Sequence, residues 1–102
     1  MKRPKKSLEV ILEGEKFAGP VASRVFLAVL ERIGLDRVQR THAMSITQER
    51  PANEKFYEQI GERWVRKHMS VDAMVGVLTR IGEELGLSIT VRARDIEQEL
   101  LS

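Results

Sequence analysis

Few side chains in this sequence could do chemistry, and they are not grouped as catalytic sets usually are. His42 and His68 lie far apart and the chain contains no cysteine, so a metal site is not expected. The glycines of residues 14–20 are not spaced as in a phosphate-binding loop, and Pro20 lacks the backbone N–H that a phosphate would use. We therefore expect no catalytic, cofactor-binding or metal-binding residues. An enzymatic alternative would depend on His42.

Basic residues form two groups that could contact phosphates without reading a nucleotide sequence. The first group lies within the first six residues, and removing its four charges from the net charge of +2 leaves −2 for the rest of the chain. The second group ends an expected helix, where basic side chains also favour the helix dipole and where Glu62 precedes Arg66 by four positions. The candidate phosphate contacts are Lys2, Arg3, Lys5, Lys6, Arg63, Arg66 and Lys67.

The helix expected to begin at Ser70 carries more apolar residues than one buried face requires. Its outward positions include one basic residue, Arg80, so the helix is not suited to reading base edges in the major groove. Val71, Val75 and Val77 are the candidate oligomer interface, because an apolar surplus of this kind favours packing against another helix. We also expect no strand to carry an aromatic residue on which a base could stack.

The pattern of apolar residues predicts the elements that must position these side chains. Alternation over 8–13 predicts a strand with Leu8, Val10 and Leu12 inward, and the period changes to that of a helix after Pro20. The stripe formed by Phe56, Tyr57, Ile60, Trp64 and Val65 predicts a second helix ending near residue 68. The expected order is strand 8–13, helix 20–33, strand 37–46, helix to 68, helix 70–85, strand 88–94 and a short helix from Asp95.

This order predicts an α+β fold with a small three-stranded sheet backed by helices, and a parallel connection between the first two strands. Gly34 and Gly86 should end their helices with positive φ, and each is followed by a leucine that folds back on the last turn. Outward Glu9 and Glu13 are expected to pair with Arg92 and Arg94 across the sheet.

Length and composition limit the class of protein. The 102 residues, 42% of them hydrophobic, suffice for one core, and we expect a flexible basic tail over 1–7 followed by a single domain over 8–102. The longest apolar run, 25–30, is far shorter than a membrane span of about 20 residues. We therefore expect a soluble, cysteine-free cytoplasmic protein that does not enter a membrane.

Three short segments resemble known families. Residues 53–61 resemble the asparagine-to-glycine helix of N-acetyltransferases, which implies a general-acid role for Tyr57, but the acetyl-CoA pyrophosphate loop is missing. Residues 90–97 are similar to the last loop and helix of archaeal histones. The order of elements around Gly14 and Gly34 is similar to Alba-type nucleic-acid-binding proteins, except that Glu15 stands where a lysine is expected. None of these resemblances assigns the chain to a family.

Two functional hypotheses remain. The first is a small non-catalytic homo-oligomeric binding protein that acts in regulation or assembly through a helix face, its partner being a second copy or another protein. The alternative is a nucleic-acid-associated protein that contacts the DNA or RNA backbone through its basic tail and the cluster at 63–68.

Overall fold

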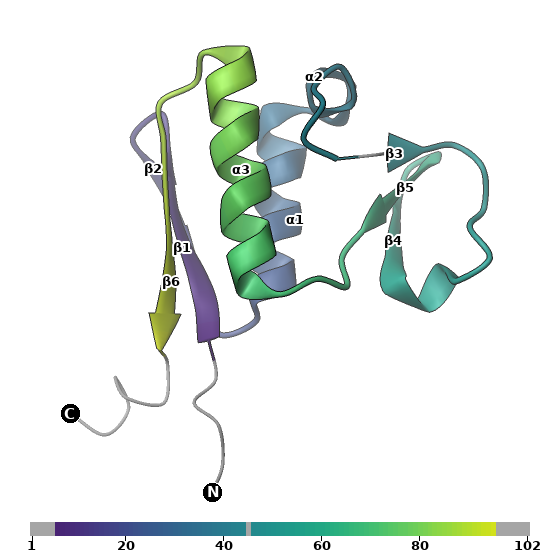
Figure 1. Ribbon diagram of the computed structural model, residues 1–102, viewed down its shortest axis with the longest axis horizontal. Coiled ribbons are helices and arrows are strands. Elements are labelled where there is room, and N and C mark those ends of the chain that lie inside the picture. The colour runs from purple at the N-terminus through teal and green to yellow at the C-terminus, as the bar shows by residue number, and fades with distance from the viewer. Residues whose placement is uncertain (1–5, 45, 96–102) are drawn as a thin grey trace, which may run out of the picture.

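A computed structural model of the chain describes residues 6–44 and 46–95 and confirms an α+β fold (Figure 1). The strands are β1 (Lys6–Leu12), β2 (Glu15–Ala18), β3 (Ile46–Thr47), β4 (Tyr57–Ile60), β5 (Arg63–Arg66) and β6 (Ile89–Asp95). The helices are α1 (Ala22–Ile33), α2 (Leu35–Gln39), α3 (Val71–Leu85) and the short 3₁₀ helix η1 (Glu54–Phe56). Sheet A has the order β2-β1-β6 and sheet B the order β3-β5-β4. Helices α1 and α3 cover one face of sheet A, and sheet B lies beyond α1 on the side away from sheet A.

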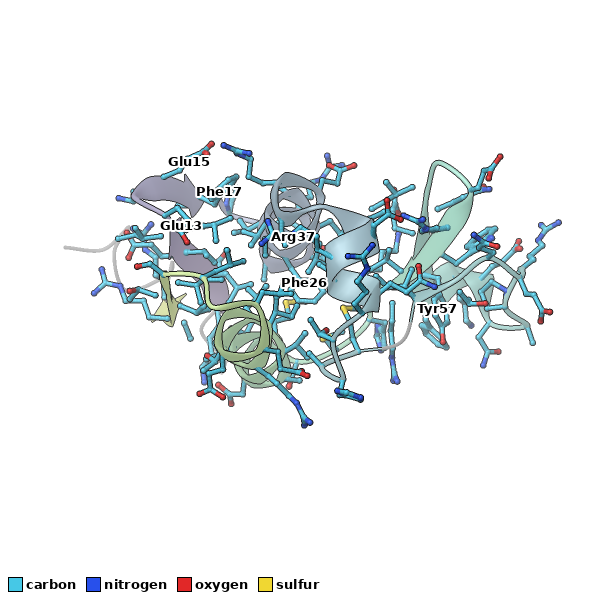
Figure 2. The ribbon with its side chains drawn as sticks, turned by 90° about the horizontal axis from the view of Figure 1, so that it is seen from above. Glu13, Glu15, Phe17, Phe26, Arg37 and Tyr57 are labelled. Carbon is cyan, nitrogen blue, oxygen red and sulfur yellow. The ribbon has the colours of Figure 1, made fainter. Side chains whose placement is uncertain are left out.

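The hydrophobic core lies between sheet A and these two helices. Leu8, Val10 and Leu12 point inward from β1 and are buried, as their alternation predicts. They meet Phe26 of α1, which is fully buried, whereas Tyr57 lies far out on the β4 side (Figure 2). The remaining buried core residues are Val25, Val29, Leu30, Ile33, Val38, Ile46, Val65, Met74, Leu78 and Ile81.

The chain turns back after β1 and forms a strand between the predicted strand 8–13 and the predicted helix 20–33, where no strand is predicted. Glu13 and Gly14, the two residues between Leu12 and its partner Glu15, have φ values of 50° and 84°. Two successive positive φ values are those of a type I′ turn, whose twist matches that of paired strands. Residues 15–18 therefore pair with β1 as β2.

The prediction of a helix ending near residue 68 is wrong, because residues 57–66 form the β4–β5 hairpin. Ile60 pairs with Arg63 across the two-residue turn formed by Gly61 and Glu62, and Gly61 has a φ of 62°. Glycine at the first turn position with positive φ is what a type II′ hairpin requires, whereas the same glycine inside a helix costs about 1 kcal/mol relative to alanine. Aromatic and β-branched residues on both sides also favour strands.

The strand predicted over 37–46 is also wrong. Its first half belongs to α2, where Val38 is fully buried, and β3 (Ile46–Thr47) is the only strand in this stretch among the described residues. Arg40 and His42 interrupt the alternation that a strand would need, and the Thr41 hydroxyl instead donates to the Val38 carbonyl at 2.7 Å. The expected parallel connection is absent from the described part of the chain, where all strand pairs are antiparallel.

The expected helix ends are confirmed in part. The Ser70 hydroxyl accepts a hydrogen bond from the Ala73 N–H at 3.1 Å and begins α3, as predicted. Gly34 and Gly86 both have positive φ, but only Gly86 is left-handed in ψ as well. Gly34, with ψ of 123°, directs the chain into α2 rather than into a strand.

Strand β6 begins and ends one residue later than predicted. The Glu9 carboxylate accepts a hydrogen bond from Arg92, as expected. Glu13 instead accepts from the Ser88 N–H at 2.9 Å, and its own N–H donates to the Ser88 carbonyl. The predicted short helix after Asp95 lies outside the described residues.

Gly82 allows α3 to lie close to β6. A β-carbon built at this buried position would be 2.2 Å from Cγ2 of Ile89, the first residue of β6. Gly76, six residues earlier on the same helix, is exposed and a β-carbon there would meet no atom within 4 Å.

We predict that Gly82→Ala lowers the free energy of unfolding by about 1–3 kcal/mol, because the added methyl forces Ile89 or α3 to shift. The matched control Gly76→Ala should stabilise the protein, by up to about 1 kcal/mol, through helix propensity alone. Urea unfolding followed by circular dichroism measures both values. The loss should shrink in an Ile89→Ala background, and an unchanged loss there would contradict the contact.

Candidate functional site

The longest strand edge without a partner strand in the described structure is on sheet A. Both outer strands, β2 and β6, pair on one side with β1. Strand β2 is four residues long, contains Lys16 and ends just before Gly19-Pro20, all of which discourage further pairing. Strand β6 is seven residues long and contains neither proline nor glycine, although it carries the charged residues Arg92, Arg94 and Asp95. Its outer edge is therefore suited to receiving another strand.

Helix α3 lies over β6, and its orientation separates the three valines of the candidate oligomer interface. Gly82 faces Ile89 of β6, while Glu84 reaches back to the loop after α2 and accepts a hydrogen bond from the His42 N–H at 2.9 Å. At about 100° per residue, Val71 and Val75 project on the Gly82 side of α3 and Val77 projects on the Glu84 side. All three are partly buried and pack against the core. Val71 and Val75, but not Val77, thus border the free edge of β6.

The basic residues proposed to contact phosphates do not form one group. Arg63 is paired with Asp36, and the Lys67 ammonium lies 2.7 Å from the Glu58 carboxylate. Arg66 lies on the opposite face of β5 from Arg63, and its Nε donates to the His68 carbonyl at 3.4 Å. Lys6 is exposed at the start of β1, where Ser7 is already buried, and Lys2, Arg3 and Lys5 lie outside the described residues.

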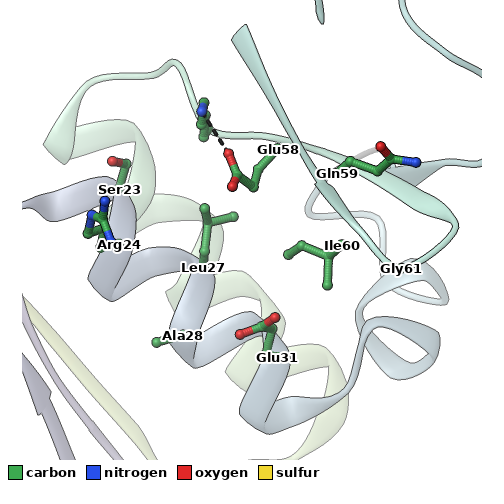
Figure 3. Close-up of a pocket in the computed structure, with 10 residues that line it drawn as sticks. Ser23, Arg24, Leu27, Ala28, Glu31, Glu58, Gln59, Ile60 and Gly61 are labelled. Carbon is green, nitrogen blue, oxygen red and sulfur yellow. Dashed lines mark hydrogen bonds and ion pairs between the residues drawn. The ribbon is translucent and has the colours of Figure 1, made fainter. Parts of the chain in front are cut away.

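A groove of about 660 Å³ runs between α1 and β4 (Figure 3). Glu58 and Ile60 point toward α1, where Leu27 and Arg24 line the other wall, while Gln59 points away. The hydrogen bond from Lys67 lowers the pKa of Glu58, and the charges of Lys67 and Arg24 lower it further. The groove therefore holds a carboxylate whose charge is already matched by its own neighbours.

His42, the residue of the enzymatic alternative, acts in the structure as a link between two elements. It lies on the loop after α2, its side chain is 82% exposed, and its Nδ1 is 2.9 Å from the Glu84 carboxylate. These hydrogen bonds from His42, through both side chain and backbone, lower the pKa of Glu84. The geometry ties the loop to α3.

Three aromatic side chains lie on strands: Phe17 on β2, where no strand is predicted, and two on the segment predicted to be a helix. Tyr57 lies on β4 and Trp64 on β5, so the expectation that no strand carries an aromatic residue is wrong. The signal that could have revealed Tyr57 and Trp64 is Gly61-Glu62 between two runs of alternating residues. The same correction removes Tyr57 from the helix on which the acetyltransferase resemblance depends.

No protein-family model, curated protein or solved structure matched this chain. Among the described residues, no group of three or more His, Asp and Glu side chains could hold a metal ion. None of the described helices combines the length and the hydropathy needed to cross a bilayer. The site must therefore be interpreted from its own geometry.

We predict that Glu58→Gln lowers stability near neutral pH and that this loss disappears in acid. The folded-state pKa of Glu58 lies below its ordinary value of 4.5, so its ionic contacts stabilise the fold above that pH and are lost as the pH falls through the lowered pKa. Thermal melts of both proteins across acidic pH measure the convergence. Glu62→Gln, which removes an exposed charge from the adjacent turn, is the matched control for the change in net charge.

Proposed function

We propose that the protein is a small non-catalytic binding protein that acts in regulation or assembly by forming a homo-oligomer, with the free edge of β6 at its interface. The observation that carries this proposal is the contrast between the two edges of sheet A. Strand β2 is short and closely followed by proline, whereas β6 offers seven regular residues, none of them proline or glycine.

Strand addition across a two-fold axis is the simplest interface that such an edge supports. Two antiparallel β6 strands would join the two three-stranded sheets into one of six strands, with the same surface used by both copies. A register centred on Val91 sets Arg92 opposite Thr90 of the second copy, whereas a register centred on Arg92 would oppose like charges. We therefore favour the register centred on Val91.

The helix layer supports the same arrangement. Val71 and Val75 project from α3 on the side of β6, so an extended sheet would bring these side chains toward their counterparts on the second copy's α3. Val77 lies on the other side of the helix and would not take part. The helix face expected from the sequence thus contributes two of its three valines to the proposed interface.

We predict that the protein is a dimer or larger at micromolar concentration and that Val75→Glu dissociates it, because a charge in the apolar contact loses its hydration. Light scattering coupled to size exclusion gives the mass, and circular dichroism checks that helix content is kept. Gly76→Glu is the matched control, since it adds the same charge at an adjacent exposed position. A monomeric parent protein, or equal dissociation by Gly76→Glu, would contradict the proposal.

The proposed register can be checked by cross-linking, because the natural chain has no cysteine. We predict that Val91→Cys forms a covalent dimer on mild oxidation, since residue 91 would face its own copy across the axis within the distance a disulfide spans. Thr90→Cys should cross-link poorly, because the two copies of residue 90 would be offset by two residues. Non-reducing gels report the difference, and equal cross-linking of both variants would exclude the register.

The alternative function, phosphate binding through the basic tail and the cluster at 63–68, has less support. Arg63 and Lys67 already pair with carboxylates, which reduces the charge they offer to a nucleic-acid backbone.

A further inference from the structure

The outer face of sheet B gathers five side chains that the core does not use. Trp64 of β5 lies opposite Gln59 of β4 and Thr47 of β3, and Arg66 lies opposite Tyr57. Because directly opposed residues share a face of a sheet, these five residues form one surface, which we call the aromatic face.

The aromatic face points away from the interior. Val65, between Trp64 and Arg66, is fully buried, so the alternation of the strand directs its two neighbours outward. In Figure 3 the β4 residues follow the same rule, with Ile60 toward α1 and Gln59 away from it. Trp64 and Tyr57 are half-buried, yet neither belongs to the hydrophobic core or packs against it.

The chemistry of this face suits bases and phosphates. Tyr57 and Trp64 are diagonal neighbours on adjacent strands, which places their backbones about 7–8 Å apart and allows each ring to meet a different base of one strand. Arg66 stands in the same row as Tyr57, and its guanidinium has further N–H donors beyond the one directed to His68. Gln59 and Thr47 add polar groups, and none of the five residues is acidic.

The cations of this hairpin differ in whether a carboxylate already neutralises them, and this difference indicates which face could bind an anionic partner. Arg63 and Lys67 are neutralised by Asp36 and Glu58. Arg66, in contrast, donates to the His68 carbonyl rather than to a carboxylate. Positive charge beside two aromatic rings is the arrangement with which proteins hold single strands without sequence preference.

We propose that the aromatic face binds single-stranded nucleic acid, with bases stacked on Trp64 and Tyr57 and a phosphate contacted by Arg66. Duplexes bind poorly, because their bases are stacked on one another and unavailable to the rings. The surface lies on the far side of the helices from β6, so it is independent of the proposed oligomer interface (Figure 1).

The experiment uses the full-length protein, whose single tryptophan makes its fluorescence a direct report on residue 64. Titration with an oligothymidylate of about 12 nucleotides should quench this fluorescence, and a duplex of equal length should not. Anisotropy of a labelled oligothymidylate should show about tenfold or greater weakening for Trp64→Ala and near-native affinity for Trp64→Phe, which keeps a stacking ring.

Charge variants distinguish binding at the aromatic face from nonspecific electrostatic attraction between the protein and nucleic acid. Arg66→Gln should reduce the log-log salt slope of binding by about 0.7, the value for one phosphate on a single strand. Arg63→Gln, on the same strand but the opposite face, should leave the slope unchanged. Val75→Glu should also leave the quenching unchanged, which keeps this test distinct from that of the oligomer.

Three results would overturn the proposal. The first is that the intact protein causes neither quenching nor an anisotropy change at low salt. The second is equal affinity of the parent and folded Trp64→Ala, which would assign binding to phosphate contacts elsewhere in the chain. The third is concentration-dependent protection of the tryptophan from a soluble quencher without nucleic acid, which would show that a second copy covers this face.

Discussion

The pairing of β1 with strands from both ends of the described chain is the constraint on which the fold depends. Strand β1 bonds to β2 on one side and to β6 on the other, and Glu9 at its centre holds both neighbours through Lys16 at 3.0 Å and Arg92 at 2.5 Å. Hydrogen bonds from these two cations lower the pKa of Glu9, so the charged form of the carboxylate is favoured. On the opposite face of β1, Leu8, Val10 and Leu12 provide the surface against which α1 and α3 pack. Helix positions, and the surfaces the helices present, follow from this sheet.

The sequence pattern predicts those elements whose apolar residues fit either the two-residue period of a strand or the 3.6-residue period of a helix, but not both. Leu8, Val10 and Leu12 alternate without ambiguity, and α1 and α3 carry apolar residues at helical spacing between recognisable end signals. The hairpin of β4 and β5 does not follow from the pattern, because Ile60, Trp64 and Val65 fit a helical stripe as well as two strands. Gly61 is the strongest feature that distinguishes the two, since its positive φ suits a tight turn and glycine weakens a helix.

The surfaces were less predictable than the elements, because they depend on contacts between residues distant in sequence. Nothing near Arg63 indicates that Asp36, 27 residues away, pairs with it. The separation of Val75 from Val77 becomes visible only when Gly82 and Glu84 identify what lies on each side of α3. Likewise, the basic residues of 63–67 looked like one patch while they were placed on a helix, and the strand distributes them over two faces.

The closure of sheet A by β6 also determines when the fold can be completed during synthesis. Glu9 and Arg92 are 83 residues apart, which at ribosomal rates of about 5–20 residues per second corresponds to roughly 4–17 s. The β1–β2 hairpin is available early and hairpins form in about 1–10 μs, so translation rather than strand pairing sets this delay. Throughout that interval the most apolar strand of the nascent chain keeps an open edge. Exposure to aggregation therefore depends on how quickly the ribosome reaches β6.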